Sequence, residues 1–194
     1  MRISGRVQID TYKVEIPKLL KTEVGEYLMK AQKKSSEKVQ VRNTARYGRG
    51  VFARRKIRRG EVVAVFDGPI YDDEFPHWTR DMLKYTIQIG PTLWRDSTGP
   101  ARYMNHSCDP NCGIRGLNKV VAMREIQKGE ELTWDYEMTE RSTWLKMKCR
   151  CGSAICRKVI GSFDRLPAER RKAYGRFVSL WLRREEQMAR RFKR

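Results

Sequence analysis

The chain has 194 residues, a length that fits one ordinary domain able to bury its own core. Lys and Arg number 42 against 23 Asp and Glu, so the formal charge is +19 and we expect an anionic partner. No apolar run approaches the ~18 residues that a membrane span needs, and the N-terminus lacks the pattern of a secretory signal; we therefore expect an intracellular protein with no membrane contact.

The basic residues are unevenly distributed along the chain. Residues 30–60 carry twelve Lys or Arg and one acid, whereas residues 61–75 carry five acids and no base. Such polarity suits a protein that touches a polyanion with one face and a cationic group with another. Solubility with non-specific adhesion would produce the same pattern, so a nucleic-acid contact through the basic surface stays open.

The N-terminal region is predicted to be a strand and helix lead-in. Val7–Ile9 and Val14–Ile16 alternate in the manner of strands, and Pro17 then opens a segment with apolar residues at helical spacing. Residues 31–38 are polar and charged, which is typical of a connection.

From Val39 the pattern becomes mainly β, with short runs separated by Gly or Pro. These runs are Val39–Val41, Gly50–Ala53, Val62–Phe66, Tyr85–Ile89, Val120–Met123 and Leu132–Tyr136. The tail from Arg165 to Arg194 returns to helix, with eleven basic residues against three acids. Its apolar residues lie near one face, which favours a docking helix with a solvated basic side over a nucleic-acid-binding helix. They are Tyr174, Phe177, Val178, Trp181, Met188 and Phe192.

Three short motifs lie in or beside the β-like runs. Gly48-Arg49-Gly50 allows a close backbone approach to a ligand, although a lone Gly-x-Gly is usually an ordinary turn. Asn105-His106-Ser107-Cys108 concentrates polar side chains that must either hydrogen-bond within the fold or line a polar ligand. In Glu131-Leu132-Thr133-Trp134-Asp135-Tyr136, the two aromatic residues share one face, which usually means core.

The cysteines provide the fourth feature. Three of the five cysteines crowd into residues 149–156, at Cys149, Cys151 and Cys156. In a reducing compartment this spacing favours a metal over a disulfide, and zinc is the natural candidate.

The order and combination of these features over residues 39–160 resemble the SET-domain protein lysine methyltransferases with a post-SET zinc segment. The resemblance implies a mainly β fold of several small sheets with a pseudoknot-like substructure. It also implies a lead-in (1–38), a SET domain (39–140), a post-SET zinc-binding segment (141–162) and a basic C-terminal helix (163–194).

The same resemblance assigns roles to residues. Tyr136 would be catalytic, with Tyr85 and Trp134 as walls of the lysine channel. S-adenosylmethionine would be the co-substrate, and one structural zinc ion would be bound. The cofactor residues would be Gly48, Arg49, Gly50, Asn105 and His106, with Ile160 covering the adenine. The zinc ligands would be Cys108, Cys149, Cys151 and Cys156.

The implied substrate is a lysine in histone tails or in other basic proteins associated with nucleic acid. We expect a monomer located in the nucleus on chromatin in a eukaryote, or in the cytoplasm or nucleoid in a prokaryote. Trp134 stands where relatives commonly carry Phe or Tyr, and because it lacks a phenol the family rule implies di- or trimethylation. Two other interpretations are a catalytically silent SET-like peptide-binding module and a zinc-stabilised basic nucleic-acid-binding protein.

Overall fold

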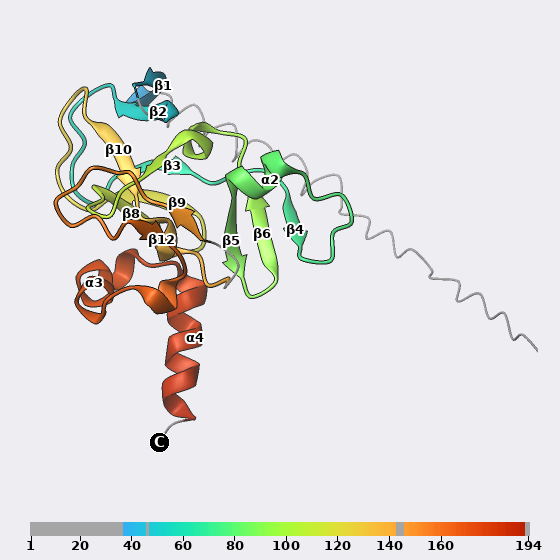
Figure 1. Ribbon diagram of the computed structural model, residues 1–194. Coiled ribbons are helices and arrows are strands. Elements are labelled where there is room, and N and C mark those ends of the chain that lie inside the picture. Colours follow the sequence, from blue (N-terminus) through green and yellow to red (C-terminus); the bar gives the residue numbers. More distant parts are fainter. Residues whose placement is uncertain (1–36, 46, 143–145, 193–194) are drawn as a thin grey trace, which may run out of the picture.

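The structure is a computed structural model, and it describes residues 37–45, 47–142 and 146–192. The strands and helix predicted before residue 37 lie outside the described residues. The described chain is mainly β, with several small sheets and short helices, which confirms the predicted fold class (Figure 1). No helix within these described ranges is both long and apolar enough to cross a membrane.

The sheet that positions the predicted motifs has the strand order β1-β2-β10-β7. Its strands are β1 (Val39–Thr44), β2 (Gly48–Ala53), β10 (Glu131–Trp134) and β7 (Asn105–His106). Strand β2 pairs antiparallel with β1 and β10, whereas β7 runs parallel to β10. The centre of the sheet is fully buried at Val51 and Leu132, which pair with each other. The three motifs therefore meet in one sheet.

Two three-stranded antiparallel sheets and one two-stranded sheet complete the β structure. The order β3-β9-β8 joins β3 (Val62–Val65), β9 (Lys119–Ala122) and β8 (Cys112–Arg115). The order β4-β6-β5 joins β4 (Ile70–Asp72), β6 (Leu93–Asp96) and β5 (Thr86–Gly90), and lies to one side of the body in Figure 1. Strands β11 (Met147–Lys148) and β12 (Val159–Ile160) pair antiparallel.

Several predicted boundaries were wrong. Tyr85 ends the helix α2 (Arg80–Tyr85) and β5 begins at Thr86. Tyr136 does not continue β10, because the Asp135 side chain accepts a hydrogen bond from the backbone N–H of Glu137 and caps the short 3-10 helix η2 (Tyr136–Met138). A second 3-10 helix, η1 (Pro100–Tyr103), precedes β7.

The predicted C-terminal helix is divided into four pieces. They are η3 (Phe163–Arg165), α3 (Ala168–Tyr174), η4 (Gly175–Phe177) and α4 (Leu180–Arg191). Pro167 directly precedes α3, and Gly175 has a φ of 50°, a conformation that ends α3 and suits glycine.

The buried face of this region is also shorter than predicted. Trp181 is buried, but Met188 is 48% exposed and Phe192 is 91% exposed, because the later turns of α4 extend away from the body (Figure 1). η4 lies against the β3-β9-β8 sheet, where a Cβ on Gly113 would approach the Cβ of Phe177 to 2.6 Å. Trp181, in the first turn of α4, donates its indole N–H to the backbone oxygens of Gln88 in β5 and of Thr139. The prediction of a docking helix therefore holds for the first turn of α4 and fails for its last.

Candidate active site

The β1-β2 hairpin carries Gly48-Arg49-Gly50 at the start of β2 and is called the glycine hairpin below. It is held against Asn105 by close packing. A Cβ added to Gly50 would lie 2.5 Å from Glu131 Oε1 and 2.7 Å from Thr44 Cγ2, so a larger residue would have to displace these side chains. The Asn105 side-chain amide donates to Glu131 Oε1 at 2.7 Å and to the backbone oxygen of Arg49 at 3.2 Å. These contacts fix the Gly48–Gly50 backbone against β7.

Tyr136 lies two residues beyond the end of β10, and its side chain reaches back to the chain before β7. Its hydroxyl donates to the backbone oxygen of Met104 at 3.1 Å, and its ring lies 5.0 Å from the ring of Trp134, centroid to centroid. Burial raises the pKa of Tyr136, so the hydroxyl keeps its proton at neutral pH. The indole N–H of Trp134 is buried and has no hydrogen-bond partner among the described residues.

One cavity of about 570 Å³ connects the glycine hairpin with the aromatic residues. Ligand pockets commonly have volumes of ~300–1,000 Å³. Six residues predicted to bind the cofactor or to surround the substrate lysine line this cavity. They are Gly48, Arg49, Asn105, Tyr85, Trp134 and Tyr136. The guanidinium of Arg49 lies 3.9 Å from the centre of the Tyr103 ring, which also lines the cavity.

Three of the predicted cofactor residues do not line this cavity. Gly50 belongs to the glycine hairpin but packs against the side chains of Glu131 and Thr44. Ile160 is buried beside Cys108 and Cys149 and packs against Tyr136. His106 is turned toward the thiols, with its Nε2 atom 3.4 Å from Cys108 Sγ.

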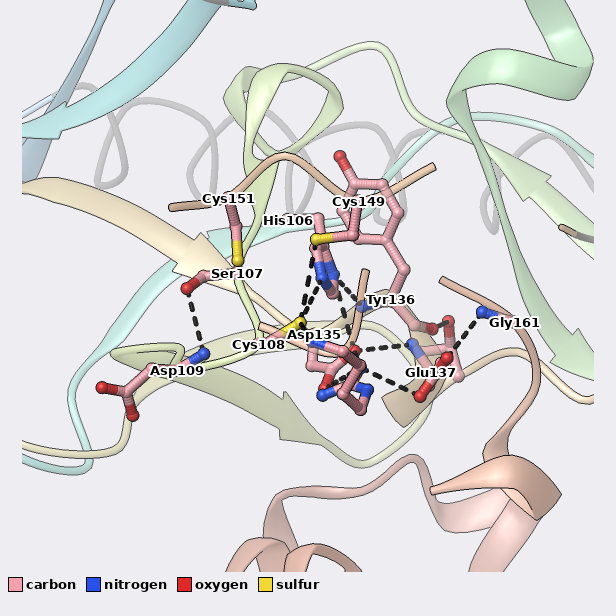
Figure 2. Close-up of polar contacts among 12 residues, drawn as sticks. His106, Ser107, Cys108, Asp109, Asp135, Tyr136, Glu137, Cys149, Cys151 and Gly161 are labelled. Carbon is pink, nitrogen blue, oxygen red and sulfur yellow. Dashed lines mark hydrogen bonds and ion pairs between the residues drawn. The ribbon is translucent and has the colours of Figure 1, made fainter. Parts of the chain in front are cut away.

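A cluster of cysteine sulfur atoms lies beside Tyr136 (Figure 2). Cys108, Cys149 and Cys151 offer ligand atoms that lie, with one nitrogen of His106, within 4.8 Å of one another. The Cys108 and Cys149 Sγ atoms are 3.7 Å apart, close to the ~3.8 Å separation that tetrahedral zinc with Zn–S bonds of ~2.3 Å requires. The donor chemistry and spacing therefore fit a zinc ion.

Cys156 lies beside this cluster without belonging to the tight group. It packs against Cys108 and Cys149, with its Sγ atom 4.0 Å from the Cys149 backbone oxygen. The backbone N–H of Lys158 donates to Cys156 Sγ at 3.4 Å, and that of Arg157 donates to Cys108 Sγ at 3.3 Å. Cys112, which was not predicted to bind metal, is fully buried in the main core.

His106 is neutral at physiological pH. Burial is the main cause that lowers its pKa to about 4, which Asp135 opposes and Arg157 reinforces. Its Nδ1 atom accepts a hydrogen bond from the backbone N–H of Tyr136 at 3.4 Å. The same Nδ1 atom lies 3.5 Å from Asp135 Oδ1, so each tautomer of the neutral ring finds a partner at this nitrogen, while Nε2 faces Cys108.

A buried ionic network flanks Tyr136 and was not anticipated from the sequence (Figure 2). The Arg157 guanidinium donates to Asp135 at 2.8 Å and to Glu137 at 2.9 Å, and the Tyr174 hydroxyl donates to Asp135 at 2.8 Å. Both acids are almost completely buried. The only available signal was that two acids flank Tyr136 while an arginine follows Cys156, and neither spacing indicates contact.

The chain is similar in sequence to known proteins. A sequence model described as SET domain matches residues 48–137. Human "Histone-lysine N-methyltransferase 2B" is 34% identical over an alignment of 146 residues that covers 66% of this chain and 5% of that protein. "Histone-lysine N-methyltransferase ash1" of Drosophila melanogaster is 31% identical over an alignment of 156 residues that covers 70% of this chain and 7% of that protein. The chain thus spans a small part of these relatives.

The fold is also similar to that of solved structures. The crystal structure of KRYPTONITE in complex with mCHG DNA and SAH has a TM-score of 0.52 at 27% identity, covering 63% of this chain and 28% of that one. KRYPTONITE with mCHH DNA, H3(1-15) peptide and SAH has a TM-score of 0.50, also at 27% identity, covering 63% and 29%.

Proposed function

This chain carries a SET domain and has histone-lysine N-methyltransferases among its homologues, and we propose that it transfers methyl groups from S-adenosylmethionine to protein lysine side chains. One observation carries the proposal: a single cavity is lined by Gly48, Arg49 and Asn105 on one part of its wall and by Tyr85, Trp134 and Tyr136 on another. Such a cavity holds donor and acceptor of the methyl group side by side, and orientation contributes much of the rate in a direct transfer.

S-adenosylmethionine would supply the methyl group, bound by Gly48, Arg49 and Asn105. The aromatic residues would surround the lysine side chain and exclude water from it. A free lysine amine has a pKa of about 10.4, and a dry environment disfavours its charged form, so the channel promotes the neutral amine. The protonated Tyr136 hydroxyl would orient that amine.

Zinc would have a structural role, held by Cys108, Cys149, Cys151 and Cys156. Four thiolates form a closed site without an open position for chemistry. The ion would tie residues 141–162 to Cys108, three residues after Asn105, and so fasten the predicted post-SET segment beside the cavity. Cys156 would complete the four thiolates, and His106, whose Nε2 faces Cys108, is the alternative fourth ligand.

The proposed substrates are histone tails or other basic proteins associated with nucleic acid, which would place the protein on chromatin. Support comes from the homologues' names and from KRYPTONITE, which was solved with an H3(1-15) peptide and with DNA. The charge of +19 would also favour a nucleic-acid contact near the substrate. A monomer remains our prediction.

The experiment is transfer of labelled methyl from S-adenosylmethionine to the H3(1-15) peptide and to core histones. Tyr136→Phe should reduce turnover about 100-fold or more, as loss of an oriented donor typically does, while S-adenosylhomocysteine still binds. A fully active Phe variant would refute the role of Tyr136. Peptide binding without transfer by the native protein would indicate a silent module, and salt-dependent DNA binding alone would indicate a nucleic-acid-binding protein.

Mass spectrometry of the products tests the proposed degree of methylation. Because Trp134 has no phenol to restrain the amine, we expect di- or trimethyl products. The larger indole would instead narrow the channel and favour a lower degree of methylation. Exclusive monomethylation of every good substrate would therefore contradict the proposal.

A further inference from the structure

The cavity contains a charged group that methyl transfer does not use. Among the described residues that line the cavity, Glu140 is the one acid. It is only 8% exposed. The other ionised side chains of the wall are the cations Arg49, Lys84 and Arg102. A single buried carboxylate in a cavity meant for a cationic substrate calls for a specific explanation.

The Glu140 carboxylate has hydrogen bonds but no counter-ion among the described residues. Its Oε1 atom accepts from the backbone N–H of Ser142 at 2.7 Å and also from the Ser142 hydroxyl. Within the described part of the chain, no cationic side chain forms an ion pair with it. The adjacent Arg141 instead pairs with Asp164 and Glu185. Burial raises the pKa of Glu140, so an arriving cation would stabilise its ionised form.

Three hydrogen bonds fix the backbone of residues 139–141 around Glu140. The Glu140 backbone oxygen accepts from the N–H of Phe163 at 2.6 Å, and the Arg141 N–H donates to Gln88 Oε1 at 2.8 Å. The Thr139 backbone oxygen accepts from the Trp181 indole N–H at 3.2 Å. The carboxylate is therefore preorganised on a rigid wall, as recognition of a charged partner requires.

We propose that Glu140 recognises a second basic side chain of the substrate, one that lies near the target lysine in its sequence. The target amine itself is a poor partner, because it must be neutral to react and a neighbouring carboxylate would keep it protonated. An arginine guanidinium stays charged at all relevant pH values and gains most from a desolvated carboxylate. The proposal rests on the proposed function, since it names the class of peptide which that cavity selects.

The test uses synthetic peptides with one central lysine in an alanine and glycine background, each carrying one arginine at a varied neighbouring position. Binding is measured by fluorescence anisotropy in the presence of S-adenosylhomocysteine, and methyl transfer is measured separately. The native protein should prefer arginine at one or two positions. Glu140→Gln, which keeps shape and can still accept from Ser142, should weaken binding of those peptides roughly 30-fold or more, as loss of one member of a buried ion pair does.

Controls separate recognition from folding. Glu140→Gln should bind the peptide without arginine as well as the native protein does, and Glu140→Asp should retain part of the preference. Glu169 is an exposed residue of α3, so Glu169→Gln should change neither peptide binding nor the arginine preference. A native protein without arginine preference, or an undiminished preference in Glu140→Gln, would overturn the proposal. Selective peptide binding without methyl transfer would instead refute the proposed function alone, and absence of any peptide binding would overturn both.

Discussion

The hydroxyl of Tyr174 donates a 2.8 Å hydrogen bond to Oδ2 of Asp135, the residue that directly precedes Tyr136. Tyr174 belongs to α3, beyond the segment 48–137 that matches the SET domain. The C-terminal helices thus support the chain beside the candidate catalytic tyrosine rather than merely covering a sheet.

Tyr174→Phe should therefore reduce stability without altering the shape of the core. The variant removes a buried hydrogen bond to a carboxylate, a bond typically worth ~1.5–3 kcal/mol. Urea denaturation should show a lower midpoint at an unchanged slope. An unchanged midpoint would mean that Asp135 is adequately satisfied by Arg157 and by the N–H of Glu137.

Arg157→Met should destabilise the protein more strongly. It leaves two almost completely buried carboxylates, Asp135 and Glu137, without their cation, and breaking a buried ion pair typically costs ~3–5 kcal/mol. The backbone N–H that faces Cys108 is kept, so zinc content should change less than stability. The neighbouring Lys158→Met is the control, because Lys158 is exposed; equal losses in both variants would contradict a role for the network.

The sequence predicted which motifs lie close together, but few of the side-chain contacts that position them. The mainly β fold followed from short β-like runs separated by Gly or Pro, and the convergence of Gly48, Asn105 and Tyr136 was implied by the resemblance to SET-domain proteins. In the β4-β6-β5 sheet only β5 was predicted. Strand β4 has three residues and no buried one, and β6 has four residues with one buried, so neither shows an alternation to read. Contacts such as Arg157 with Asp135 span 22 positions and depend on the tertiary fold.

The helix prediction failed for a different reason. Helical periodicity in residues 165–194 identified Trp181 as buried, but periodicity carries no information about where the body ends, so Phe192 was wrongly assigned to the same face. Glu140 showed no motif at all. Its significance comes from the cavity that it lines and from the lack of a cation beside it among the described residues.

Glu61 should give the fold a measurable dependence on acid. A hydrogen bond from Arg55 at 2.9 Å is the main cause that lowers the pKa of Glu61 from 4.5 to about 2, although burial opposes it, and the Arg58 N–H contributes further. Because the folded-state pKa lies below the unfolded one, the stabilisation is complete above pH 4.5 and declines as pH falls toward 2.

Glu61→Gln should accordingly cost ~0.5–1 kcal/mol near neutral pH, since the pair is partly exposed and screened. Denaturation midpoints of both proteins, followed from about pH 7 to about pH 3, should converge as the carboxylate protonates. A difference that is independent of pH would show that packing, rather than charge, is responsible.

The fourth zinc ligand can be identified by two substitutions. Cys156→Ser should lower the zinc content well below one ion per chain, whereas His106→Gln should retain it, because the proposed set of Cys108, Cys149, Cys151 and Cys156 supplies four thiolates without His106. Elemental analysis gives the content, and absorption of the Co²⁺-substituted protein distinguishes four sulfur ligands from three with one nitrogen. Loss of zinc in His106→Gln with retention in Cys156→Ser would instead assign the site to the tight group of His106 with Cys108, Cys149 and Cys151.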